Sequence, residues 1–180
     1  MGGVAGGLLV LGVESGRAQE GVFLAVEESP RYLFPDASDV SDRSVVSTPY
    51  LQSRIRAIMG RPPTLWESAY RIFTAKRGER LLGFVAVVEE IGKHRPITFA
   101  VAVSPDATVH DIAVLAYREA YGGEVKERRF LRQYAGRKAT AALLPYQDIQ
   151  NIAGATLSVQ ATGRAVKKAV ALLIATGDLH

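Results

Sequence analysis

The chain has 180 residues and a net charge of +4, with 48% hydrophobic and 22% charged residues. This balance excludes a disordered chain and fits one domain with a sizeable core. No cysteine is present, which excludes disulfides, thiolate zinc sites and cysteine nucleophiles. The mild basic excess is weak evidence for nucleic-acid binding and no reader motif supports it, so we expect no nucleic-acid partner.

The first segment is apolar and short. Residues 4–13 read VAGGLLVLGV, and the small residues Gly16 and Ala18 follow them. The run is too short to span a bilayer. Because small residues suited to a cleavage site follow it, we predict a signal peptide over residues 1–18 and a periplasmic or extracytoplasmic location. Because no positive region precedes the run, an upstream start or a short N-terminal helix remains an alternative.

Helical patterns come next, and we interpret residues 19–65 as a helical N-terminal extension. Residues 21–35 predict a short helix that is broken by Pro30. The segment 36–48 is rich in Asp and Ser and is typical of a connector with turns. Residues 50–59 predict an amphipathic helix.

From residue 66 onward the hydrophobic pattern changes to period two or to short apolar runs, which predicts strands. Short turns separate these strands, so they form an antiparallel meander. The third strand has one face of large side chains and one of small side chains, and a helix can pack closely against the small face. The four predicted strands are 66–75, 80–90, 97–104 and 109–117.

The C-terminal part returns to a helical period. We predict a helix over 125–135, a loop over 137–155 and a last helix over 160–175, with Lys167 and Lys168 outside its apolar stripe. The fold class is therefore α+β: an antiparallel sheet of about four strands or more, with helices packed on one side.

One short stretch before the last helix raises a question of chemistry. Residues 152–158 read IAGATLS, with two hydroxyls among small neighbours. A helix N-terminus offers unpaired N–H groups and the positive end of a dipole, which suits a phosphate. Thr156 therefore has three possible roles: it caps the helix, it hydrogen-bonds a phosphate, or it is esterified by one.

The stretch resembles the attachment motif of the FMN-binding domain family, which includes the small flavoprotein subunits of sodium-pumping quinone reductase and of Rnf complexes. That motif is Asp-x-x-Ser/Thr-Gly-Ala-Thr, and Gly154, Ala155 and Thr156 match its end. Gln150 stands in place of the Asp, and Ala153 in place of Ser or Thr.

The resemblance extends over residues 66–175. The strand pattern GFVAVVEE, the turn PDATV and the segment Glu119-Ala120-Tyr121-Gly122-Gly123 occur in the order that the family shows. The family often has Thr where this chain has Ala120. The resemblance implies an FMN-binding domain over 66–180, with the last helix following the flavin-attachment loop.

The resemblance also implies roles and partners. Thr156 accepts FMN in a phosphoester made from FAD by a flavin transferase. Other partners are unidentified redox donor and acceptor proteins, including a membrane complex through which the protein associates with the membrane. An electron-carrier domain or redox subunit is implied rather than a stand-alone enzyme. The remaining implied cofactor-binding residues are Gly154, Ala155, Leu157, Ser158, Glu119, Tyr121 and Gly122. Lys93 is a further candidate from the sequence itself, because the basic cluster Lys93-His94-Arg95 lies at a strand turn and can contact a flavin or a phosphate.

Plainer interpretations stay open for several residues. Glu119 can be a surface carboxylate, and Lys93-His94-Arg95 can be a solvated turn. Trp66 can be a core or edge residue instead of a residue that stacks on a flavin ring. The three histidines are far apart in sequence, so we predict no metal site. The alternative function is a module that binds FMN or another phosphorylated ligand noncovalently, without redox enzyme activity.

Overall fold

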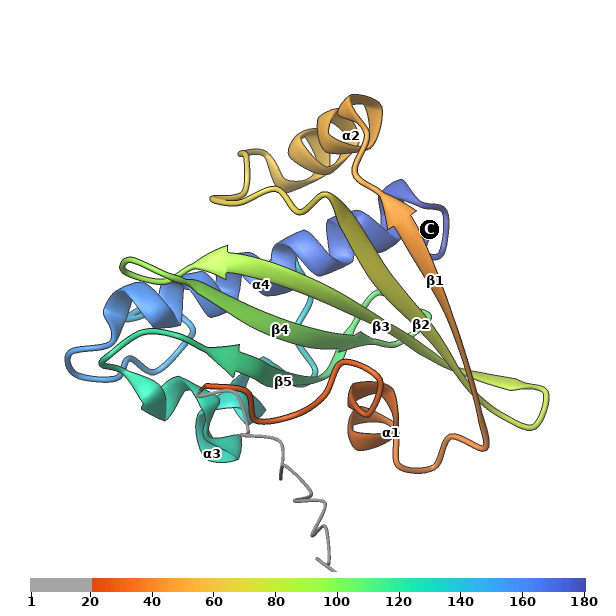
Figure 1. The fold of residues 1–180 in the computed structure, drawn as a ribbon, viewed down its shortest axis with the longest axis horizontal. Helices are drawn as coiled ribbons and strands as arrows, with labels where there is room; N and C mark the ends of the chain where they lie inside the picture. The colour runs from red at the N-terminus through yellow and green to blue at the C-terminus, as the bar shows by residue number, and fades with distance from the viewer. Residues whose placement is uncertain (1–20) are drawn as a thin grey trace, which may run out of the picture.

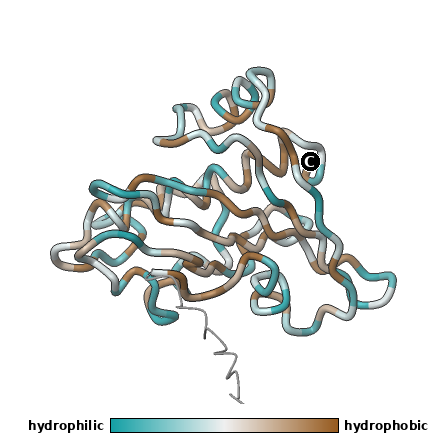
Figure 2. The backbone as a smooth tube through the Cα atoms, in the orientation of Figure 1, coloured by the Kyte–Doolittle hydropathy of each residue, from teal (hydrophilic) through white to brown (hydrophobic). Residues whose placement is uncertain are grey.

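The computed structural model describes residues 21–180, so the signal peptide expected over 1–18 lies outside the described residues. Five strands form one antiparallel sheet in the order β1-β2-β3-β4-β5, in which β2 to β5 are the meander predicted from the sequence (Figure 1). In Figure 2 the strands carry hydrophobic stretches, while the turns that join them are largely hydrophilic. The strands are β1 (Asp39–Val46), β2 (Ala69–Arg77), β3 (Arg80–Ile91), β4 (Pro96–Val103) and β5 (Val109–Tyr117).

The edge strand β1 corrects the interpretation of residues 36–48 as a connector. It pairs with β2 along its whole length, from Asp39 opposite Lys76 to Val46 opposite Ala69. Six of its eight side chains are exposed, so no alternation of apolar and polar residues marks it in the sequence. The range 19–65 is thus only partly helical, because it also supplies this strand.

The two faces of the sheet are covered by different helices. The long α4 (Thr156–Ala175) and α2 (Pro49–Met59) pack over the face that carries Phe99 and Val101. The short α1 (Ser29–Leu33) covers the small face, where Ala100 and Ala102 belong to its cluster. The expected division of the third predicted strand into a large and a small face is confirmed. The expectation that helices pack on one side only is corrected, because helices cover both faces.

Three helix boundaries differ from the sequence predictions. Pro30 lies in the first turn of α1 and does not break the helix, because N–H groups in the first turn have no partner within the helix and proline can be accommodated there. The helix predicted over 125–135 is three short pieces: the 3-10 helix η1 (Gly123–Lys126), α3 (Arg128–Leu131) and the 3-10 helix η2 (Arg132–Tyr134). The last helix begins at Thr156, four residues before the predicted start at Gln160.

Lys168 is fully buried, which corrects its expected place outside the apolar stripe of the last helix. Its Nζ lies 2.6 Å from Glu67 Oε2 and donates to the carbonyls of Leu65 and Glu89 at 2.7 and 2.8 Å. Arg164, one turn earlier, pairs with buried Glu90 at 3.1 Å. Buried charges therefore join α4 to the segment before β2 and to β3, although helical periodicity alone would assign these charged side chains to solvent.

Within residues 21–180, no helix combines the length and the apolar character required to cross a membrane.

Candidate functional site

A cavity of about 410 Å³ lies where the turn between β3 and β4, the segment after β5 and the start of α4 meet. It brings together every residue predicted for the cofactor site except Gly122, although these residues come from three separate parts of the chain. Ala120 and His94 also line it. The lining residues are Lys93, His94, Glu119, Ala120, Tyr121, Gly154, Ala155, Thr156, Leu157 and Ser158.

Gly122 does not line this cavity, but it sets how closely two of its walls approach. Its backbone is left-handed, with φ of +80°, and a Cβ at this position would lie 2.9 Å from Cβ of Ala155. Ala155 itself is buried. The glycine therefore lets the segment after β5 pack directly against the residue that precedes α4.

Thr156 is the first residue of α4 and its hydroxyl does not cap the helix. Ala155 is the N-cap residue, and no side chain accepts a hydrogen bond from the first turn. Thr156 Oγ1 instead accepts a hydrogen bond from Asn151 Nδ2 at 3.0 Å. The capping role considered for Thr156 is wrong, and the positive end of a 20-residue helix remains uncapped beside the cavity.

Gly154 keeps the approach to Thr156 open. It has φ of +78°, which favours glycine, and no atom lies within 4 Å of a Cβ built there. Leu157, on the other side of Thr156, is 45% exposed. A bulky group can therefore reach the threonine hydroxyl from solvent without moving the backbone.

Glu119 organises the turn that carries the basic residues. Its Oε1 accepts hydrogen bonds from the backbone N–H groups of Lys93, His94 and Arg95 at 2.5, 2.5 and 2.9 Å. Burial alone would raise the pKa of this carboxyl, but the three N–H groups outweigh it and lower the pKa below its ordinary value. Glu119 is therefore a carboxylate that fixes the turn bearing Lys93 and His94 at the cavity.

Tyr117, at the end of β5, is a residue that the sequence analysis missed. Its Oη donates to the carbonyl of Tyr121 at 2.5 Å and lies 3.1 Å from Ser158 Oγ. Burial raises the pKa of its phenol. Ser158 is buried and shares its hydroxyl with Tyr117, so this pair ties β5 to the first turn of α4. The hydrophobic pattern of the sequence identifies Tyr117 only as the last residue of a strand.

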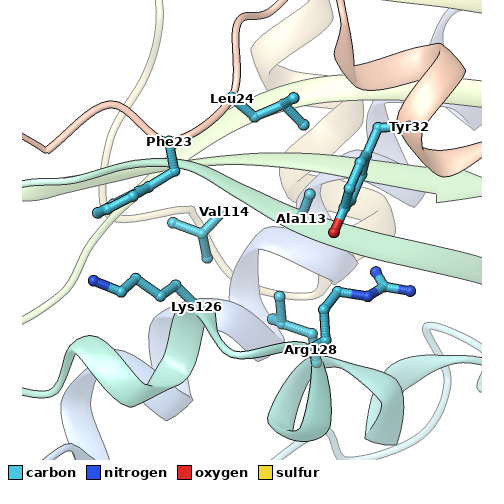
Figure 3. Close-up of a pocket in the computed structure, with 8 residues that line it drawn as sticks. Phe23, Leu24, Tyr32, Ala113, Val114, Lys126 and Arg128 are labelled. Atoms are coloured by element: carbon cyan, nitrogen blue, oxygen red, sulfur yellow. The ribbon is translucent and has the colours of Figure 1, made fainter. Parts of the chain in front are cut away.

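A second cavity, of about 270 Å³, contains none of the predicted site residues. Figure 3 shows the rings of Phe23 and Tyr32 beside it, with Lys126 and Arg128 across from them. Both cations are already engaged: Lys126 Nζ lies 4.3 Å from the Phe23 ring centroid, and Arg128 pairs with Asp111 at 2.8 Å. Trp66 lines neither cavity and packs partly buried against the core, as the plainer interpretation expected.

The fold and the site together define a class of protein. It is an α+β domain that presents a threonine hydroxyl at the N-terminus of a helix. Residues 92–171 match the family model described as the FMN-binding domain. This match, which spans less than half of the chain, confirms the resemblance seen in the sequence. The match contains all the residues predicted for the cofactor site.

Two similar proteins refine the comparison. The chain is 29% identical over 105 residues to a subunit of the proton-translocating ferredoxin:NAD(+) oxidoreductase complex of Clostridium ljungdahlii, covering 54% of this chain and 57% of that protein. It thus spans little more than half the length of this relative. A crystal structure of NqrC from Shewanella oneidensis superposes with a TM-score of 0.57 at 17% identity, covering 81% of this chain and 84% of that one, which supports the fold alone.

Proposed function

We propose that this protein is an electron-transfer flavoprotein subunit that carries FMN joined to Thr156 through a phosphoester. The observation that carries the proposal is the state of the Thr156 hydroxyl. It lines a cavity, stands at the N-terminus of a long helix and caps nothing. The family match and the 29%-identical complex subunit support a flavin and a role in electron transfer.

The attachment step uses the threonine oxygen as the nucleophile. The Thr156 oxygen forms a bond to the flavin-side phosphorus of FAD, and the pyrophosphate bond to the adenylate breaks. AMP leaves, and the hydroxyl proton passes to a base of the flavin transferase. Since both substrate and product are esters of phosphoric acid, the step needs no oxidant or reductant.

The chain's own groups suit the charge of the product. A phosphodiester keeps one negative charge, and the unpaired N–H groups and dipole of α4 favour an anion next to Thr156. Lys93 and His94 line the same cavity on the turn that Glu119 fixes. When bound, the isoalloxazine ring supplies the redox chemistry, while the protein supplies attachment and electrostatics.

Location and partners are part of the same proposal. The predicted signal peptide supports an extracytoplasmic protein, which requires a flavin transferase in that compartment. The relative's name includes a redox complex, which supports donor and acceptor proteins in a membrane complex as partners. We propose that the protein acts within such a complex rather than as a stand-alone enzyme.

The test is the mass of the intact protein and its flavin fluorescence in a denaturing gel. The full chain is exported in a host that has the flavin transferase, beside Thr156→Val. We expect a fluorescent band with the added mass of the FMN group in the wild type and neither signal in the variant. A dark, unmodified wild type, under conditions that label another family member, would favour the noncovalent alternative.

A further inference from the structure

Asn151 connects Thr156 to an exposed tyrosine. Its Nδ2 donates to Thr156 Oγ1 at 3.0 Å and to Tyr146 Oη at 2.6 Å. Asn151 Oδ1 is buried and has no hydrogen-bond partner among residues 21–180. Leaving this acceptor buried and unpaired costs free energy. We take the two hydrogen bonds of the amide nitrogen to be what holds the side chain in this orientation.

The loop that carries Asn151 and Tyr146 is anchored to α4. Asp148 accepts hydrogen bonds from the backbone N–H groups of Leu143 and Leu144, both at 2.9 Å. Gly163, inside α4, lets this loop come close, since a Cβ there would lie 2.1 Å from the Leu143 carbonyl oxygen. The helix thus accepts a glycine in its interior, and the loop gains a fixed position beside α4.

We propose that Asn151 is a positioning residue that holds the Thr156 oxygen in the orientation required for flavin attachment. This inference rests on the proposed function. An amide N–H can donate to the hydroxyl oxygen before attachment and to the ester oxygen afterwards, because neither role requires the threonine proton. The same contact therefore persists through the reaction.

The chemistry at this position discriminates between side chains. An aspartate in place of Asn151 has the same shape but only accepts hydrogen bonds when ionised. It would lose its contact with Thr156 once the hydroxyl proton is gone, and its charge would repel the phosphate. A role limited to filling space predicts that Asn151→Asp is tolerated better than Asn151→Ala, whereas positioning predicts the reverse.

The experiment measures the rate at which purified flavin transferase labels the unmodified protein with FAD. Full-length wild type, Asn151→Ala, Asn151→Asp and Tyr146→Phe are compared, with Thr156→Val as the blank. We expect kcat to fall about tenfold in Asn151→Ala, as for the loss of one hydrogen bond, and further in Asn151→Asp. Tyr146→Phe should lose only about twofold, because Asn151 still reaches Thr156.

Separate outcomes distinguish the two proposals. KM for the protein substrate and the melting temperature should stay near the wild-type values, since a positioning role changes kcat. Labelled wild type together with wild-type rates in both Asn151 variants would overturn the inference and leave the proposed function intact. A loss confined to KM, or less loss in Asn151→Asp than in Asn151→Ala, would also overturn it. An unlabelled wild type would overturn both proposals.

Discussion

The two long helices of the molecule each have a threonine at their start, and the two side chains are used differently. Thr48 precedes α2 in an extended conformation, and its Oγ1 accepts a hydrogen bond from the Leu51 N–H at 3.2 Å. Thr156 is already the first helical residue of α4, and its hydroxyl contacts Asn151 instead. One hydroxyl belongs to the helix and the other faces the cavity.

The difference shows that a shift of one position decides what a hydroxyl can do. A side chain reaches the N–H groups of the first turn from the N-cap position, before the helix begins. Pro49, which is favoured at the first position of a helix, makes Thr48 the N-cap residue of α2. At Thr156 the N-cap is Ala155, which has no hydrogen-bonding side chain, so the helix leaves its donors unpaired where an anion can bind.

Among variants around the starts of the two helices, the largest effect on stability is expected at Gly122, next to the N-cap residue of α4. Gly122→Ala combines an unfavourable left-handed backbone with a contact of 2.9 Å to Ala155, and should cost about 2 to 3 kcal/mol. Gly60→Ala, at the C-terminus of α2, has a similar φ of +72° but open space around the new methyl group, and should cost about 1 kcal/mol. Urea unfolding of both variants measures the difference, and equal losses would contradict the close contact at Gly122.

A smaller effect separates the two threonines themselves. Thr48→Val removes a cap and should lower the free energy of unfolding by about 1 kcal/mol. Thr156→Val removes no cap and should change it by less than about 0.5 kcal/mol, while abolishing covalent labelling. Thermal unfolding of the unlabelled proteins gives the comparison. A greater loss in Thr156→Val than in Thr48→Val would mean that Thr156 supports the helix after all.

The smallest effect is expected at the turn that faces the start of α4. The pKa of Glu119 is lowered in the folded protein, so its contribution to stability is present above the ordinary pKa of 4.5 and is lost as the pH falls through the folded value. Glu119→Gln should therefore be less stable than wild type at pH 7, and the gap should close in acid. Urea unfolding as a function of pH measures the gap.

Glu79→Gln is the matched control for this pH dependence. Glu79 lies in the turn between β2 and β3 and makes no hydrogen bond or ion pair through its side chain within residues 21–180. We expect no pH-dependent gap for this variant. A gap for Glu119→Gln that persists unchanged at low pH would show that its carboxylate charge is not what holds the turn.

Much of the fold follows from the sequence because burial leaves a periodic trace. Strands β2 to β5 have buried faces, and their ranges agree with the predictions to within a few residues. The edge strand β1 has almost no buried face, so nothing in its composition distinguishes it from a loop. Lys168 shows the opposite failure: its charge suggests solvent, but carbonyl groups distant in sequence surround it.

The site is predictable by resemblance rather than by pattern. Small residues and a threonine are weak signals, and physics alone does not choose between the phosphate roles of Thr156 and the capping role that the structure excludes. Tyr117 and Asn151 carry no sequence signal of their own, because their roles depend on contacts with Ser158 and Thr156 formed only in the folded chain. The prediction of a signal peptide stays a prediction.

The open character of the cavity has a consequence for how long a cofactor stays. Tyr121 is 84% exposed and Leu157 is 45% exposed, so the walls offer little enclosure to a flat ring. A noncovalent ligand in such a place would dissociate quickly, since affinity comes from burial. Under the proposed attachment to Thr156, residence time would not depend on the walls, and the ring would stay accessible to a redox partner at a high effective concentration.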